Sequence, residues 1–290
     1  MLSCILTIAR TTVLDLARQK VFAILLVFAL VAIGSSIFMA KLSFQEEFQM
    51  LKDVCLGAMS VFTSLLAILA TAAFLPKDLE ERTIYTVLAK PVPRFAYLAG
   101  KLGGILVLLF LFTLLMAVVS ALVLWMREAA VLGEIRSQFS AEGAMLTEEA
   151  RAAVQSVKDA TFTPGLIAGV GAIYLKAAVL ASMTLLVSTF ATSALFTVMV
   201  SAAIYFIGHL QATAREYWVG GMAVGEWWQT ILVAVVALIF PDLQAFNLAD
   251  DVIAGAAIPL GVFLRTVALG GVYVLVYFGI ASFVFSGREL

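Results

Sequence analysis

Charged side chains are scarce in this sequence, and their scarcity excludes an ordinary soluble domain. Asp, Glu, Lys and Arg together make up 13% of its 290 residues, about half of the roughly 25% found in soluble proteins. Hydrophobic residues make up 63%, and the mean hydropathy is +1.08. We therefore predict an all-α integral membrane protein.

Residues that build metal and redox sites are almost missing. The chain has one histidine and two cysteines, and it contains neither a CxxC nor an HExxH motif. A metal site formed by the protein is therefore not expected. Cys4 and Cys55 fall on opposite sides of the membrane in the predicted topology, so they are not expected to form a disulfide within one chain. An intramembrane hydrolase would need a nucleophile with a histidine partner, and no such pair is visible.

A means of powering transport is also missing. The chain lacks the GxxxxGK[ST] motif that binds ATP phosphates. Ion-coupled transporters use Asp, Glu or His inside the membrane as relays, and the hydrophobic segments hold only Lys176 and, at the outer end of one segment, His209. Any work that this protein does must therefore be powered by another protein. No basic patch indicates nucleic-acid binding.

Six hydrophobic segments are long enough to cross a bilayer, which takes about 20 apolar residues. They are predicted at residues 21–40, 54–75, 102–126, 166–190, 194–210 and 266–285. Residues 1–20 precede the first span and are predicted to form an amphipathic interfacial helix. Its apolar face would hold Leu2, Ile5, Leu6, Ala9, Val13, Leu16 and Ala17. A signal peptide is the alternative, but its positive charges would precede the apolar run instead of following it.

Basic residues set the predicted orientation, because short loops rich in Lys and Arg stay in the cytosol. Arg10, Arg18 and Lys20 precede the first span, so the N-terminus is predicted to be cytoplasmic. An even number of spans then returns the C-terminus to the same side. The largest polar insertion, residues 127–163, is predicted to be a small external helical insertion whose mixed charges form a solvated surface.

A second external segment is predicted at residues 227–258, as a re-entrant or interfacial element. Its apolar part, residues 227–240, is shorter than a spanning helix requires. A crossing at this point would also place Arg288 outside, against the preference for basic residues in the cytosol. We therefore predict that this segment does not cross.

The polar segment 76–101 lies between the second and third spans and is rich in Lys and Arg, which places it in the cytosol. Asp78 followed by Glu81 has the spacing of a capping box, so a helix is predicted to begin at residue 78. Pro91 and Pro93 must end it near residue 89. A simple turn between two spans needs no such helix, so we interpret it as a docking surface. An ordinary interfacial turn is the alternative.

The residues of this loop resemble one known family. Residues 80–84 (EERTI), 88–94 (LAKPVPR) and 100–101 (GK) are similar to the cytoplasmic loop of ABC-2-type permeases, the membrane subunits of ATP-driven ABC exporters. Residues 240–247 (FPDLQAFN) and 285–290 (FSGREL) provide a second match. Together with the hydropathy profile, the resemblance covers nearly the whole chain.

The resemblance implies that the loop holds a coupling helix that docks on a separate ABC ATPase subunit. The implied ATPase-coupling residues are Asp78, Glu80, Glu81, Arg82, Thr83, Pro91, Arg94 and Lys101. The whole chain, residues 1–290, would be one transmembrane permease domain in the cell membrane, the bacterial inner membrane, paired with a second permease copy. It would be no enzyme and would bind no cofactor, because ATP and Mg would be held by the ATPase.

The two intramembrane groups allow more than one interpretation. Lys176 is a candidate contact in the substrate path, and snorkelling outward to the interface is the alternative. His209 is expected to bond to a neighbouring carbonyl at the outer interface. The leading hypothesis is an exporter permease in the lipid bilayer. The alternative function is an ATP-driven mechanotransmission or scaffold protein of the cell envelope, which passes motion to an external partner through residues 127–163 and moves no solute.

Overall fold

The computed structural model describes residues 2–40, 47–74, 76, 93–141, 148–221, 240–256 and 258–287. It is 91% helical, and the described residues contain no strand. Six of its helices are long and apolar enough to cross a membrane. The predicted fold class, an all-α protein with six candidate membrane-spanning helices, is therefore confirmed.

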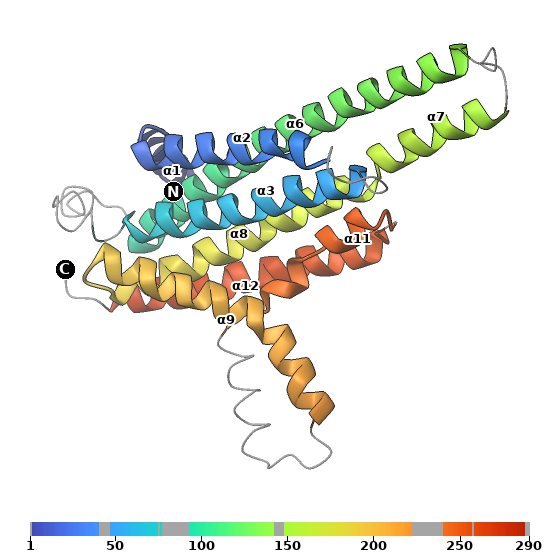
Figure 1. The fold of residues 1–290 in the computed structure, drawn as a ribbon. Coiled ribbons are helices and arrows are strands. Elements are labelled where there is room, and N and C mark those ends of the chain that lie inside the picture. The colour runs from blue at the N-terminus through green and yellow to red at the C-terminus, as the bar shows by residue number, and fades with distance from the viewer. Residues whose placement is uncertain are drawn as a thin grey trace.

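The helices lie side by side in an elongated bundle (Figure 1). They are α1 (Leu2–Ala17), α2 (Lys20–Ala40), α3 (Glu47–Ala72), α6 (Arg94–Ala141), α7 (Glu148–Thr161), α8 (Gly165–Phe190), α9 (Ala194–Gly221), the 3-10 helix η2 (Leu243–Phe246), α11 (Ala249–Ile253) and α12 (Leu260–Ser286). We call the end with α1 and the last turn of α12 the α1 end. The opposite end, where α6 and α7 project, is the hairpin end.

Helix α8 forms the centre of the bundle. All ten residues from Lys176 to Leu185 are buried, as expected for a helix that is surrounded on every side. Helices α2 and α12 lie at the periphery, where only 17% of their most hydrophobic stretches is buried inside the protein. Their remaining apolar surface is suited to contact with lipid.

Helix α1 packs across the beginning of α6, where Gly100 and Gly104 leave room for it. A Cβ atom at Gly104 would lie 2.7 Å from both the carbonyl oxygen of Ala9 and the Cβ of Thr12. The small-xxx-small spacing of these two glycines therefore serves close helix packing. The pair Gly165 and Gly169 has the same use at the start of α8, where Cβ atoms would meet Val252 at 3.5 and 3.1 Å.

The predicted apolar face of α1 is partly wrong. Leu16 is buried as expected, but Leu6 is 65% exposed and Thr12 is only 3% exposed. Thr12 can face inward because its hydroxyl donates to the carbonyl of Ile8 at 2.8 Å, which satisfies the buried polar group. The side of α1 that holds Thr12 therefore faces the groove of α6 at Gly100 and Gly104. The side that holds Leu6 faces away from the protein.

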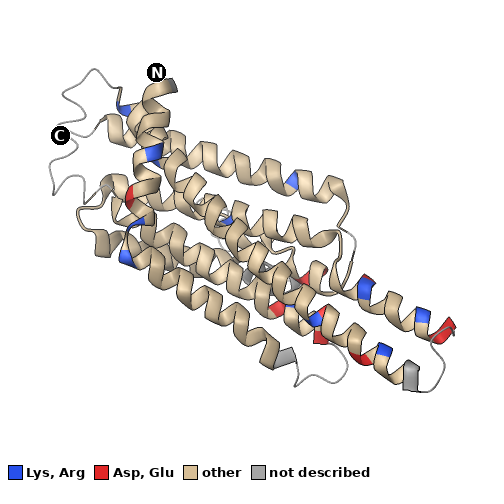
Figure 2. Ribbon diagram, turned by 90° about the horizontal axis from the view of Figure 1, so that it is seen from above, with Lys and Arg blue, Asp and Glu red and all other residues tan. Residues whose placement is uncertain are grey.

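The insertion at residues 127–163 is a helical hairpin. Helix α6 continues without a break through the predicted end of the third span to Ala141, and α7 runs back beside it (Figure 1). At its base the guanidinium of Arg127 on α6 is 2.7 Å from the carboxylate of Glu47 on α3, and these side chains are 12% and 29% exposed. Figure 2 shows acidic and basic residues mixed along the hairpin, as predicted for a solvated surface.

Two boundaries near the C-terminal half differ from prediction. Helix α9 extends to Gly221 instead of ending near residue 210, and α12 begins at Leu260 instead of residue 266. Most of the predicted re-entrant segment 227–240 lies outside the described residues. The chain that follows it packs against the bundle: a Cβ at Gly208 of α9 would lie 2.7 Å from Leu243 Cγ, and a Cβ at Gly169, near the start of α8 at the hairpin end, would lie 3.1 Å from Val252.

The α1–α6 contact can be tested with two neighbouring glycines. A Gly104→Ala substitution should lower stability by about 1–3 kcal/mol, because the added methyl group has no free space. The matched control is Gly103→Ala, where a Cβ would meet nothing within 4 Å and helix propensity should improve by up to about 1 kcal/mol. Thermal unfolding in detergent measures both. Equal melting temperatures in the two variants would contradict the close packing of α1.

Candidate functional site

The predicted coupling residues Asp78, Glu80, Glu81, Arg82, Thr83 and Pro91 lie outside the described residues, as does the predicted helix at 78–89. Arg94 and Lys101 are described, and both belong to α6, which begins seven residues before the predicted loop end at Lys101. The carbonyl of Pro93 accepts bonds from the amides of Ala96 and Tyr97 at 2.9 and 3.2 Å. Pro93 therefore starts the helix, as proline commonly does.

Arg94 caps the C-terminus of α12. Its Nη1 donates to the carbonyl oxygens of Ser286 at 2.8 Å and Phe285 at 3.4 Å. The last carbonyls of a helix have no partner within the helix, and a cation is favoured there by the helix dipole. This contact ties the first residue of α6 to the end of the last span.

Lys101 lies about two turns after Arg94 on α6, and its ammonium contacts aromatic rings. Its ammonium lies 3.5 Å from the ring centre of Phe74 and 5.6 Å from that of Tyr97, which are cation–π distances. Tyr97 in turn stacks on Phe285, with ring centres 6.2 Å apart and planes at 19°. We call Phe74, Arg94, Tyr97, Lys101 and Phe285 the anchor cluster.

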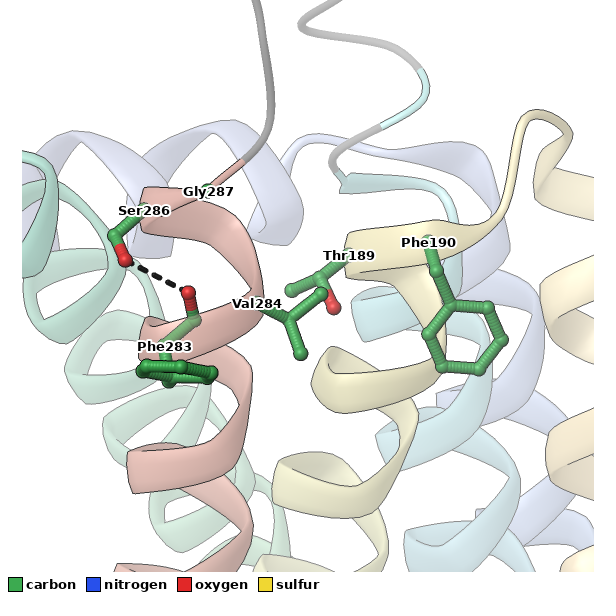
Figure 3. Close-up of a pocket in the computed structure, with 6 residues that line it drawn as sticks. All are labelled: Thr189, Phe190, Phe283, Val284, Ser286 and Gly287. Atoms are coloured by element: carbon green, nitrogen blue, oxygen red, sulfur yellow. Dashed lines mark hydrogen bonds between the residues drawn. The ribbon is translucent and has the colours of Figure 1, made fainter.

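The anchor cluster lies where the segment 77–92 leaves and rejoins the described bundle. It joins the end of α3, the beginning of α6 and the end of α12. Beside it, a hollow of about 560 Å³ opens between the last turns of α8 and α12 and is lined by Thr189, Phe190, Phe283, Val284, Ser286 and Gly287 (Figure 3). The anchor cluster thus joins three candidate membrane helices at the two points where the described chain borders residues 77–92.

A second polar site lies in the middle of the bundle. Lys176 on α8 is only 3% exposed, and its ammonium donates to the hydroxyl of Ser60 on α3 at 2.6 Å. The same nitrogen lies 3.5 Å from Nε2 of His209 on α9. These three residues form the Lys176 cluster, which connects the three helices α3, α8 and α9 at about half their depth.

The hydrogen bonds of His209 define its tautomer. Its Nδ1 lies 3.2 Å from the carbonyl oxygen of Tyr205, and a carbonyl can only accept, so Nδ1 carries the proton. In the neutral ring Nε2 is then an acceptor facing the lysine. The ring of Tyr205 covers the imidazole with centres 4.5 Å apart. Lysine thus has two neutral acceptors, one hydroxyl and one imidazole.

The structure corrects the alternative interpretation of Lys176. The side chain does not snorkel outward but points into the bundle toward Ser60. The expected carbonyl contact of His209 is confirmed, and His209 lies two residues before the end of the candidate span Ala194–Gln211, although α9 itself continues to Gly221. Sequence reasoning did not single out Ser60 and Tyr205 as partners, and no local motif marks them.

Neither a scan against models of known protein families nor a search of curated proteins finds a match to this chain. The described residues contain no group of three or more His, Cys, Asp or Glu side chains that could hold a metal ion. What the six candidate spans establish is a multi-pass helical membrane protein.

The cap on α12 makes Arg94 testable. In Arg94→Gln the last turn of α12 should lose charged hydrogen bonds worth about 1 kcal/mol in this half-exposed setting. Amide hydrogen exchange of residues 283–287 should therefore speed up about fivefold. Arg18→Gln, an exposed arginine at the same end, is the control and should leave that exchange unchanged. Identical exchange in all three proteins would show that Arg94 does not hold α12.

Proposed function

We propose that this protein is the membrane-spanning subunit of an ATP-driven ABC exporter, powered by a separate ATPase that docks on the loop 76–101. The observation that carries the proposal is the anchor cluster, which binds both ends of that loop to the bundle. A docking loop can drive a membrane protein only if it is mechanically connected to the spans. The resemblance of residues 80–94 to ABC-2-type permeases supports the same function.

The anchor cluster would pass motion of the loop to helices α3, α6 and α12. Phe74 follows the end of α3, Arg94 and Lys101 lie in the first turns of α6, and Phe285 lies in the last turn of α12. A displacement of the loop would therefore shift these helices against the central helix α8. The proposed assembly contains two copies of this subunit and two ATPases, which hold ATP and Mg.

We further propose that the α1 end faces the cytosol. The described basic residues at that end are Arg10, Arg18, Lys20, Arg94 and Lys101, and Asp15 is the only described acidic residue there. The projecting hairpin instead mixes both signs (Figure 2). Basic residues near the ends of spans are retained in the cytosol, so the hairpin would be external.

Single cysteines test this orientation in a background without Cys4 and Cys55. Cysteines at Gln138 and Asp251, both exposed at the hairpin end, should react from outside with a membrane-impermeant thiol reagent. A cysteine at Thr192, exposed at the α1 end, should react only after permeabilisation. Labelling of Asp251→Cys only after permeabilisation would mean that residues 227–240 cross the membrane, and the six-span topology would be wrong.

Docking itself is tested by Glu80→Ala and Arg82→Ala. Removing one partner of a desolvated charge pair commonly costs about 2–5 kcal/mol of association, much of it from the charge left unpaired. Both variants should therefore bind the ATPase at least about tenfold more weakly and uncouple hydrolysis from transport. Affinity of the purified, co-expressed ATPase for the permease in nanodiscs is the measurement.

The control is Glu148→Ala on the hairpin, where the carboxylate is 90% exposed beside Arg151. Exposed ion pairs contribute only about 0–1 kcal/mol, so this variant should behave as wild type. Unchanged ATPase affinity in Glu80→Ala, Arg82→Ala and the double variant would refute docking through this loop. The loop would then be an ordinary interfacial turn.

A second function, transmission of motion to an external partner without solute transport, is favoured by one observation. Helix α6 runs unbroken from the anchor cluster at Arg94 to the hairpin tip at Ala141. A single rigid helix of this kind could carry motion from the ATPase to a protein outside. Accumulation of a radiolabelled solute in vesicles holding the complex separates the two functions, because only an exporter moves solute.

A further inference from the structure

The Lys176 cluster holds a cation whose described partners are all neutral. The ammonium of Lys176 has three protons, and the two recorded acceptors are the Ser60 hydroxyl and the His209 imidazole. No ion pair joins Lys176 to a described carboxylate. A buried charge without a counter-charge is costly in a membrane and marks a functional group. The missing complement to this lysine is an anion.

Unused hydroxyl groups lie between this lysine and the α1 end. Buried hydroxyl oxygens without a hydrogen-bond partner among the described residues occur on the same three helices, α3, α8 and α9. Thr163 and Gln211 also lack a described partner, but they lie further from the α1 end; the hydroxyls nearer to it belong to Thr63, Thr71, Thr184 and Ser201. On α3 these residues lie closer to the α1 end than Ser60 does, on α8 closer than Lys176, and on α9 closer than His209. Buried polar groups are normally satisfied, so a polar ligand that reaches these hydroxyls would find unused donors and acceptors.

We propose that the Lys176 cluster binds the anionic headgroup, a carboxylate or phosphate, of an amphiphilic substrate. The proposal rests on the proposed transport function and names the substrate class for it. Lys176 supplies the charge, while Ser60 and His209 hold its ammonium in place. The hydroxyls of α3, α8 and α9 would receive the headgroup on its way from the α1 end.

The surroundings favour an amphiphile over a small soluble anion. The cluster lies about 17 Å from the start of α8 and about 21 Å from its end, at the helical rise of 1.5 Å per residue. On α9, the neighbours of Tyr205 and His209 are Phe206 and Leu210, each 63% exposed on the outer surface of the bundle. An apolar tail can lie against these side chains in the lipid while its headgroup reaches the lysine.

Native mass spectrometry of the purified full chain in a neutral detergent tests the proposal. Oleate and dodecyl phosphate are the anionic probes, dioleoylphosphatidylglycerol represents a membrane lipid, and oleyl alcohol is the neutral control. We expect one oleate or dodecyl phosphate per chain and no comparable binding of oleyl alcohol. Preference for the phospholipid over both single-chain probes would identify the anion as a membrane lipid and overturn the assignment to a substrate.

The decisive variant is Lys176→Gln, which should weaken oleate binding about tenfold or more because a charge-assisted hydrogen bond is lost. Lys176→Arg keeps the charge and should stay within about threefold of wild type. The matched control is Lys52→Gln, which removes the other buried lysine of the described chain, 2% exposed on α3. It should bind oleate as wild type does.

Equal oleate affinity in wild type and Lys176→Gln would overturn the proposal, and so would equal binding of oleate and oleyl alcohol. If Lys176→Gln does not fold, as judged by gel filtration, Ser60→Ala decides. It should weaken oleate binding about threefold by releasing the ammonium, and wild-type affinity there would overturn the site. The assay contains no ATPase, so its failure is distinguishable from a failure of docking, which Glu80→Ala and Arg82→Ala test separately.

Discussion

The absence of water from the hydrocarbon core is the constraint on which this structure depends. A backbone amide in that region can find a partner only within its own helix or in a closed sheet, so each candidate span is a continuous helix. The same constraint makes each buried polar side chain significant. The Thr12 hydroxyl donates a hydrogen bond to the backbone of its own helix, α1, whereas the Lys176 ammonium finds its partners on two other helices. The first contact allows close helix packing, and the second leaves the positive charge of Lys176 without a described counter-charge.

The anchor cluster and the Lys176 cluster lie on different parts of the same helical framework. The anchor cluster joins α3, α6 and α12, and the Lys176 cluster joins α3, α8 and α9. Helix α3 belongs to both, with Phe74 just beyond its end and Ser60 near its middle. A shift of α3 along its axis would therefore change the position of the Ser60 hydroxyl relative to the lysine. This shared helix gives the proposed docking loop a physical route to the proposed binding site.

The number of spans could be predicted from the sequence because hydropathy is a local, one-dimensional property. The length of α6 could not, since residues 127–141 are polar and nothing in their pattern distinguishes a continuing helix from a separate external one. The orientation of the Lys176 side chain could not be predicted from the sequence either. Its partners are 116 and 33 residues away along the chain, and only packing brings them together. The rotation of α1 about its axis likewise depends on the groove at Gly100 and Gly104 of α6, which cannot be predicted from the sequence of α1 alone.

The ion pair between Arg127 and Glu47 divides α6 into two unequal arms. At 1.5 Å per residue, about 50 Å of helix lies between Arg94 and Arg127, and about 21 Å lies between Arg127 and Ala141. If α6 pivots where this contact holds it to α3, a movement at the α1 end is reduced to less than half at the hairpin tip. The force at the tip is larger in the same proportion. Such an arrangement is better suited to pressing against a neighbouring molecule than to sweeping a wide path.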